Sequence, residues 1–184
     1  MTRAAPWLLG AMCMGLVVPR GARAEEAPAI RLGGHAGLVI FDEARDLTTE
    51  DAFAQPGPTA ILGVQARLAP SWLLVEIEAS VGAILGTFDD DSSLAGATAR
   101  LELWYAFLEG DVRPFVALGP TVTAALTGDY GNDVDLGFCA GGGVMIALAA
   151  DWAVRADARW MLGDGVAGAA DDLLFTLGAD YAFR

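Results

Sequence analysis

Residues 152–161 alternate, with a period of two, between two kinds of side chain. Every second residue from Trp152 to Trp160 is apolar, and the residues between them carry charges in the order Arg155, Asp157, Arg159. Alternate side chains of a β-strand point to opposite faces, so this segment predicts a strand whose faces meet different surroundings. Either the apolar face packs in the core of a soluble protein, or it faces lipid and the charges fill a barrel.

The composition is unusually hydrophobic, as is common in membrane proteins, but no segment after residue 24 could form a transmembrane helix. Hydrophobic residues make up 54% of the 184 residues, the mean hydropathy is +0.44, and all 11 basic residues are arginines. No run of 18 apolar residues follows residue 24, which excludes a transmembrane helix from that part of the sequence. The formal net charge is −13, so a nucleic-acid partner is not expected.

Residues 1–24 have the features of a secretory signal peptide. Arg3 supplies a positive start, residues 7–18 are apolar, and Ala-Arg-Ala at 22–24 resembles a signal-peptidase cleavage site. An uncleaved N-terminal anchor is the alternative, which the shortness of the apolar stretch disfavours. Residues 25–184 are then expected to form one mature domain.

Turn signals and alternation divide that domain into eight candidate strands. They are expected at 30–41, 58–68, 72–85, 94–107, 112–126, 136–148, 152–162 and 173–183. Most are close to the roughly 9–11 residues that a tilted strand needs to cross a bilayer. Long polar connections, expected at 42–57, 87–93, 127–135 and 163–172, alternate with short ones. That alternation places every long loop at one end of an up-and-down meander, as in outer-membrane barrels.

In each of these strands every second residue belongs to a polar face. Together the polar faces carry nearly balanced charge, six arginines against five acids. A lumen too narrow for free water needs such balance, because an unpaired buried charge is very costly. We therefore expect a charge network in the lumen, together with the only histidine. Its predicted members are Arg31, His35, Arg67, Glu76, Glu78, Arg100, Glu102, Arg113, Arg155, Asp157, Arg159 and Asp180.

The opposite face of each predicted strand is apolar, and its aromatic residues gather near the strand ends. This distribution predicts two girdles at the membrane interfaces. Trp72, Phe107, Trp152, Tyr181 and Phe183 lie by the short turns, and Trp160 and Phe175 lie by the long loops. Closing the sheet into a barrel also removes the free edges that hydrocarbon does not tolerate.

The last strand resembles the C-terminal β-signal of bacterial outer-membrane proteins. Thr176, Gly178, Tyr181 and Phe183 match its pattern of a polar residue, a glycine and two aromatics, and Arg184 departs from it by one extra residue. In that family the outer-membrane assembly machinery recognises this strand, so the resemblance implies the same partner here.

Segments 113–119, 141–144 and 152–155 are similar to later strands of OmpA/OmpX-type barrel domains. The resemblance covers nearly all of residues 29–184. It implies an all-β fold, an eight-stranded antiparallel up-and-down transmembrane β-barrel in the bacterial outer membrane. It also implies contacts with outer-membrane lipid and lipopolysaccharide, and we expect a monomer.

Three features could carry specific chemistry, and each has a simpler interpretation. His35 could be the general base of a lipid A-modifying barrel enzyme, but a hydrogen-bonded lumen histidine is favoured. The runs at 89–93 and 129–135 could bind Ca²⁺ through oxygen, but solvated acidic loops are favoured. Cys139 is expected to be a small packing residue. No catalytic, cofactor or metal site is therefore assigned.

The function expected from the sequence is non-enzymatic. The barrel would be a structural or interaction scaffold, with acidic external loops and a lumen too narrow for bulk conduction. A lipid A-modifying enzyme, a small channel and a soluble periplasmic lipid carrier remain as alternatives.

Overall fold

Eight β-strands form one closed barrel. The computed structural model describes residues 29–41, 58–69, 75–87, 93–108, 110–127, 131–165 and 168–183. The strands are β1 (Ala29–Ile40), β2 (Thr59–Ala69), β3 (Val75–Thr87), β4 (Ser93–Ala106), β5 (Val112–Thr127), β6 (Gly131–Ala147), β7 (Trp152–Gly165) and β8 (Gly168–Phe183). Each strand pairs antiparallel with the next, and β8 pairs with β1. The predicted eight-stranded up-and-down barrel is confirmed.

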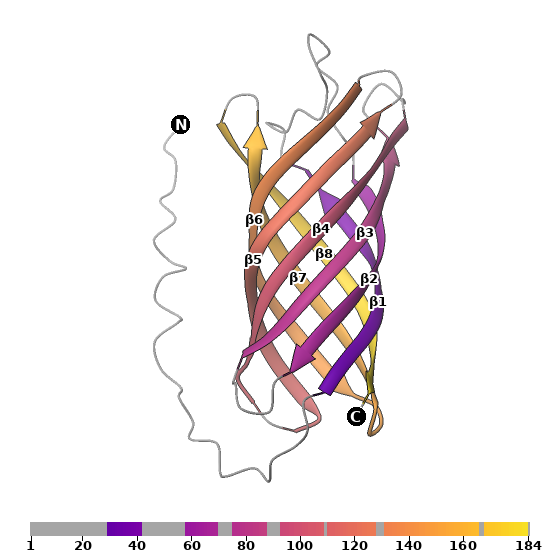
Figure 1. The fold of residues 1–184 in the computed structure, drawn as a ribbon, viewed down its shortest axis with the longest axis vertical. Helices are drawn as coiled ribbons and strands as arrows, with labels where there is room; N and C mark the ends of the chain where they lie inside the picture. Colours follow the sequence, from indigo (N-terminus) through magenta and orange to yellow (C-terminus); the bar gives the residue numbers. More distant parts are fainter. Residues whose placement is uncertain are drawn as a thin grey trace.

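The strands alternate in direction between the two ends of the barrel. In Figure 1 the strands run obliquely around the barrel axis, as closure of a sheet requires. β1, β3, β5 and β7 run toward the upper end in this view, and β2, β4, β6 and β8 run toward the lower end. β1 begins and β8 ends at the lower end. The described residues contain no helix of the length and hydropathy needed to cross a membrane.

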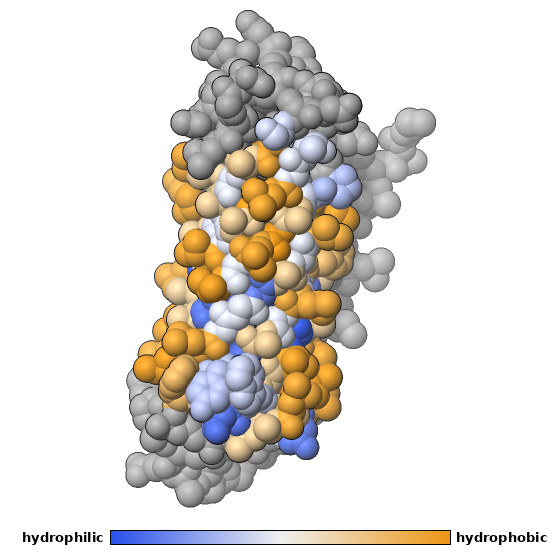
Figure 2. Space-filling model, turned by 90° about the vertical axis from the view of Figure 1, so that its right-hand side faces the viewer, coloured by the Kyte–Doolittle hydropathy of each residue, from blue (hydrophilic) through white to orange (hydrophobic). Residues whose placement is uncertain are grey.

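Each strand has an apolar outer face and an inner face turned to the lumen. On β2, Leu62 and Val64 are 67% and 66% exposed, whereas the inward Gln65 and Arg67 are 4% and 1% exposed. Figure 2 shows one side of the wall, where hydrophobic residues dominate the described surface and paler residues lie between them. Because the apolar parity faces outward, the soluble-carrier alternative, which needs it to face inward, is wrong.

The upper connections are shorter than the sequence predicts, with one exception. Residues 41–58 separate β1 from β2. β6, however, begins at Gly131, inside the loop predicted at 127–135, and β7 pairs with β8 as far as Gly165 and Gly168. The predicted strict alternation of long and short connections is therefore wrong. Asp- and Gly-rich segments continue these hairpins because cross-strand pairing satisfies their backbone groups whatever the polarity of the side chains.

Apolar side chains fill part of the lumen toward each end. The upper apolar cluster consists of Val39, Phe41, Ile61, Ile84, Leu94, Cys139, Met161 and Leu174. The lower apolar cluster consists of Trp104, Phe115, Ala117, Met145 and Ala153. Most of the charged side chains lie between the two clusters, as along β7, where three charged residues separate Ala153 from Met161. The charge network agrees with the sequence prediction, which did not include these two apolar clusters.

Candidate functional site

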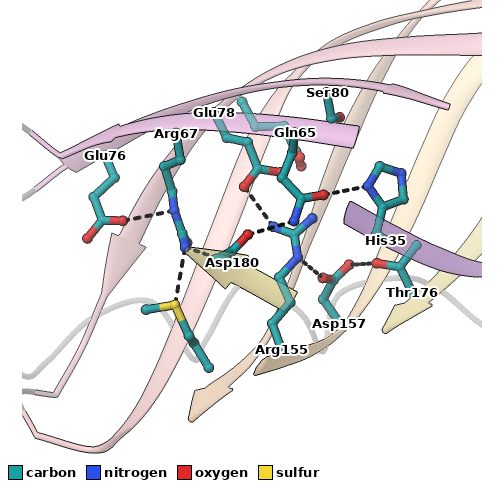
Figure 3. Close-up of polar contacts among 12 residues, drawn as sticks. His35, Gln65, Arg67, Glu76, Glu78, Ser80, Arg155, Asp157, Thr176 and Asp180 are labelled. Carbon is teal, nitrogen blue, oxygen red and sulfur yellow. Dashed lines mark hydrogen bonds and ion pairs between the residues drawn. The ribbon is translucent and has the colours of Figure 1, made fainter. Parts of the chain in front are cut away.

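A first chain of polar contacts runs across the lower part of the lumen (Figure 3). Arg67 on β2 is its centre, because its guanidinium binds Asp180 of β8 at 2.8 Å and Glu76 of β3 at 3.3 Å. Glu76 also binds Arg113 of β5 at 3.0 Å. Gln65 donates to Asp180 at 2.7 Å and contacts His35 Nδ1 through its amide oxygen. This chain of contacts therefore joins five strands around the lumen, β1, β2, β3, β5 and β8.

A second chain lies on the β7 side of the lumen. Arg155 binds Glu78 at 2.7 Å and Asp157 at 3.4 Å. Arg159 continues it, binding Asp157 at 3.2 Å and Glu102 at 2.6 Å. All five side chains are at most 1% exposed. Fully buried charges persist only when they are paired in this way.

The remaining predicted members of the network occupy its edges. Arg100 donates from Nε to Ser80 at 3.1 Å, and its Nη1 lies 4.0 Å from Glu102. Arg31 is half-buried at the lower rim, opposite Arg67 in the β1–β2 register. All twelve residues predicted for the lumen network thus lie on inward positions of their strands.

Trp104 connects the two chains of contacts and is not among the residues predicted for the lumen network. Its ring lies 4.6 Å from the Arg67 guanidinium, 5.0 Å from that of Arg155 and 5.2 Å from that of Arg159. It also stacks on Phe115 with 3.9 Å between ring centroids. Trp104 could have been found by parity, because it follows Arg100 and Glu102 at intervals of two on β4.

Glycines on neighbouring strands make room for the large polar side chains. The His35 ring lies against Gly63 of β2, where a Cβ would be 2.6 Å from the ring atoms. Gly178 of β8 lies opposite Arg155, and a Cβ there would be 3.1 Å from Arg155 Nε. Gly178 belongs to the predicted assembly signal, and in the folded barrel it borders the charge network.

The aromatic residues predicted for the girdles face outward where they are described. Trp152 contacts Tyr181, and Tyr181 contacts Phe183, which makes a continuous lower group. Phe107 is exposed just after β4, and Trp72 lies outside the described residues. Trp160 and Phe175 do not adjoin loops as predicted, because β7 extends to Gly165 and β8 begins at Gly168.

Two acidic residues predicted to lie in external loops are instead inside the upper lumen. Asp135 on β6 is 8% exposed, and Asp172 on β8 is 1% exposed. The acid runs therefore extend into the barrel rather than remaining wholly outside it. Among the described residues, no group of three or more His, Cys, Asp or Glu side chains is arranged to hold a metal ion.

The fold matches solved outer-membrane barrels at low sequence identity. Neisserial surface protein A aligns with a TM-score of 0.60 and 10% identity, over 86% of this chain and 98% of that chain. The N-terminal barrel domain of Pseudomonas aeruginosa OprF gives 0.57 and 16%, over 83% and 97%. Ail, the attachment invasion locus protein of Yersinia pestis, gives 0.50 and 14%, over 86% and 99%. At these identities the likeness shows the fold alone.

Comparison by sequence identifies the family. No curated protein matches the chain, but the profile of a domain family matches residues 8–183. That match covers almost the whole sequence, including all eight strands. The family implies a place in the outer membrane, in agreement with the outward apolar face. The chain belongs to the outer membrane protein β-barrel domain family.

Proposed function

We propose that this barrel is a non-enzymatic, non-conducting scaffold of the outer membrane. The burial of the charge network supports this proposal most directly. Both chains of polar contacts contain side chains that are at most 1% exposed. They are Arg67 and Asp180 in the first, and Arg155, Glu78 and Arg159 in the second. Water in a continuous pore would reach these groups. The upper apolar cluster adds a further barrier to ions above the network, and the lower apolar cluster packs among its arginines.

Conductance measurements test the proposal. The purified, folded protein, inserted in a planar bilayer, is expected to give no stepwise current. Reproducible single-channel steps from the wild-type protein, absent from protein-free detergent controls, would overturn it and favour the small-channel alternative. Heat-modifiable migration on gels verifies that the inserted protein is the folded barrel.

The spacing of the outward aromatic residues fits a barrel embedded in lipid. Trp152 and Trp160 are eight residues apart on β7, which corresponds to about 27 Å along the strand and about 20 Å along the axis of a typically tilted barrel. The apolar band of outer-membrane barrels is about 25 Å tall. We infer that these residues lie near the two interfaces, and that β7 and β8 continue above the upper one.

The outer surface supports lipid and lipopolysaccharide as neighbours, and a monomeric state. Exposed large apolar residues occur on all eight strands, for example Leu32 on β1 and Leu118 on β5. Such a surface, apolar all round, fits continuous contact with acyl chains rather than one protein interface. Sedimentation in detergent micelles tests this, since a single protein per micelle is expected and a stable dimer would contradict it.

The position of His35 supports a non-enzymatic role. Its ring is 3% exposed, faces the lumen between neighbouring strands and contacts Gln65 through Nδ1. A lipid substrate would have to pass through the barrel wall to reach it. Mass spectrometry of lipid A, from cells with and without the protein, tests this. A modification that requires the protein and disappears in His35→Ala would establish the enzyme alternative instead.

The acidic upper segments are the part we infer to face outward and to contact other molecules. Their carboxylates would be repelled by lipopolysaccharide phosphates, unless divalent cations bridge the two. Extraction of the protein from outer membranes with and without a chelator tests this bridging.

We also infer that the assembly machinery recognises the C-terminal strand through Thr176, Gly178, Tyr181 and Phe183. Cells carrying Phe183→Ala would then accumulate unassembled protein.

A further inference from the structure

Two side chains of β2 reach across β1 and bind β8. Asp180 of β8 accepts a hydrogen bond from Gln65 at 2.7 Å, and it pairs with Arg67 at 2.8 Å. β1 lies between these strands in the barrel wall, and Figure 3 shows both side chains converging on the carboxylate. The contacts therefore join the first hairpin to the last strand, across the β1–β8 seam that closes the barrel.

The contact depends on a missing side chain in β1. Gly33 lies opposite Gln65 on one side and opposite Asp180 on the other. A Cβ at Gly33 would collide with the Asp180 carboxylate and lie 2.7 Å from the Gln65 amide nitrogen. The side chains of β2 and β8 thus meet in space that only glycine leaves open. His35, two residues further along β1, contacts the other end of the Gln65 amide.

The apolar pattern alone does not fix how β8 pairs with β1. A shift by two residues leaves every side chain on its own face of the sheet, so the outward residues still face lipid. Such a shift moves Asp180 by about 7 Å along the strand. It would then lie opposite Arg31 or His35, not Gly33. Either side chain would occupy the space through which Gln65 and Arg67 reach the carboxylate.

We propose that Gln65, Arg67 and Asp180, meeting over Gly33, set the register in which β8 closes the barrel on β1. We call these four residues the seam latch. Its polar contacts form in full in the native register, because a shift by two residues in either direction replaces Gly33 beside Asp180 with Arg31 or His35. This role concerns closure of the fold, and it does not depend on the proposed scaffold function.

Engineered disulfides at the seam report the register directly. In a Cys139→Ala background, Ala36→Cys combined with Leu177→Cys reports the native pairing. Ala36→Cys combined with Phe175→Cys or with Ala179→Cys reports a shift by two residues in either direction. All of these positions face outward, so none of them disturbs the latch. Each protein is refolded into phospholipid vesicles and oxidised, and the cross-linked fraction is measured on gels.

Asp180→Ala is expected to raise the ratio of shifted to native cross-links about tenfold or more, since it removes the hydrogen bond from the Gln65 amide to the carboxylate and the ion pair with Arg67. Asp157→Ala is the matched control. Asp157 is also a buried carboxylate that binds Arg155 and Arg159, but it makes no contact of the latch. This control is expected to destabilise the barrel and to retain the native register.

Two results would overturn the proposal. The first is native cross-linking alone in Asp180→Ala, and the second is an equal shift in Asp157→Ala, which would make register a consequence of general stability. If Asp180→Ala does not fold, Asp180→Asn is measured in the same way. The amide keeps an acceptor for Gln65 but loses the ion pair with Arg67, so a smaller shift is expected. An unshifted register in Asp180→Asn would then contradict the latch.

Discussion

The middle of the lumen is filled mainly by paired charges, whereas its upper part is filled mainly by apolar side chains, with Asp135 and Asp172 buried beside them. In the middle, buried charges are held by pairing, as Arg155 is between Glu78 and Asp157. In the upper part, Leu174 and Ile61 fill the space by apolar packing. The two regions should therefore fail in different ways. Truncating a charged group leaves its partners buried and unpaired, whereas truncating an apolar group leaves only a cavity.

Arg155→Ala is expected to have the largest effect. It leaves the carboxylates of Glu78 and Asp157 without this cation in the lumen. Breaking a buried ion pair by removing one partner costs about 3–5 kcal/mol. The free energy of unfolding, measured by urea titration in lipid vesicles, should fall by that amount. The variant is also expected to open a small leak through the lumen. Unchanged heat-modifiability on gels together with unchanged bilayer conductance would contradict both effects.

Leu174→Ala is expected to have a somewhat smaller effect, about 2–4 kcal/mol, from lost apolar burial and the cavity that remains. The adjacent Leu173 is the matched control. It is 43% exposed on the outer face, whereas Leu174 is fully buried in the upper apolar cluster. Leu173→Ala should cost much less than Leu174→Ala in the same titration. Equal losses would mean that the upper cluster does not pack as a core.

The sequence predicted the middle of the barrel better than its upper end, and the reason is visible in particular residues. From 152 to 161, charge and apolarity alternate, so the strand and both of its faces were predictable. Asp171 and Asp172 are adjacent, one exposed and the other buried, and no alternation in the sequence separates them. The strand extension at the start of β8 depends on pairing with β7, which local sequence does not encode.

The start of β6 is predictable from the sequence, although it lies within the loop expected at 127–135. Val134 and Leu136 are 63% and 68% exposed, and Asp135 between them is buried. The alternation therefore continues without a break into the strand. Asp favours turns, but a strand of this barrel also accommodates an acid whose side chain points into a polar part of the lumen. The His35–Gln65 and Arg67–Asp180 contacts, in contrast, follow from barrel closure and could not be read from spacing.

Trp104→Leu tests whether the middle region depends on the aromatic ring as well as on charge pairing. Each arginine around Trp104 keeps its carboxylate in this variant, so no charge is left unpaired. The loss is the stacking with Phe115 and the contacts with the three guanidinium groups, which we expect to cost about 1–3 kcal/mol. Trp160→Leu, on the outer face, is the comparison. In vesicles with brominated acyl chains, Trp160 should be quenched and Trp104 should not.

Arg113→Ala is expected to have the smallest effect, although Arg113 belongs to the same network as Arg155. Its side chain is 18% exposed at the lower rim, and Glu76, its partner at 3.0 Å, is 13% exposed and also binds Arg67. Water therefore reaches both groups, and Glu76 keeps a cation when Arg113 is removed. A partly solvated pair contributes about 0–1 kcal/mol, so urea titration should show a loss several times smaller than that of Arg155→Ala. A loss as large as that of Arg155→Ala would show that ion pairs at the lower rim stabilise the barrel as much as those in the middle. Stabilisation by paired charges would then extend through the whole lower lumen.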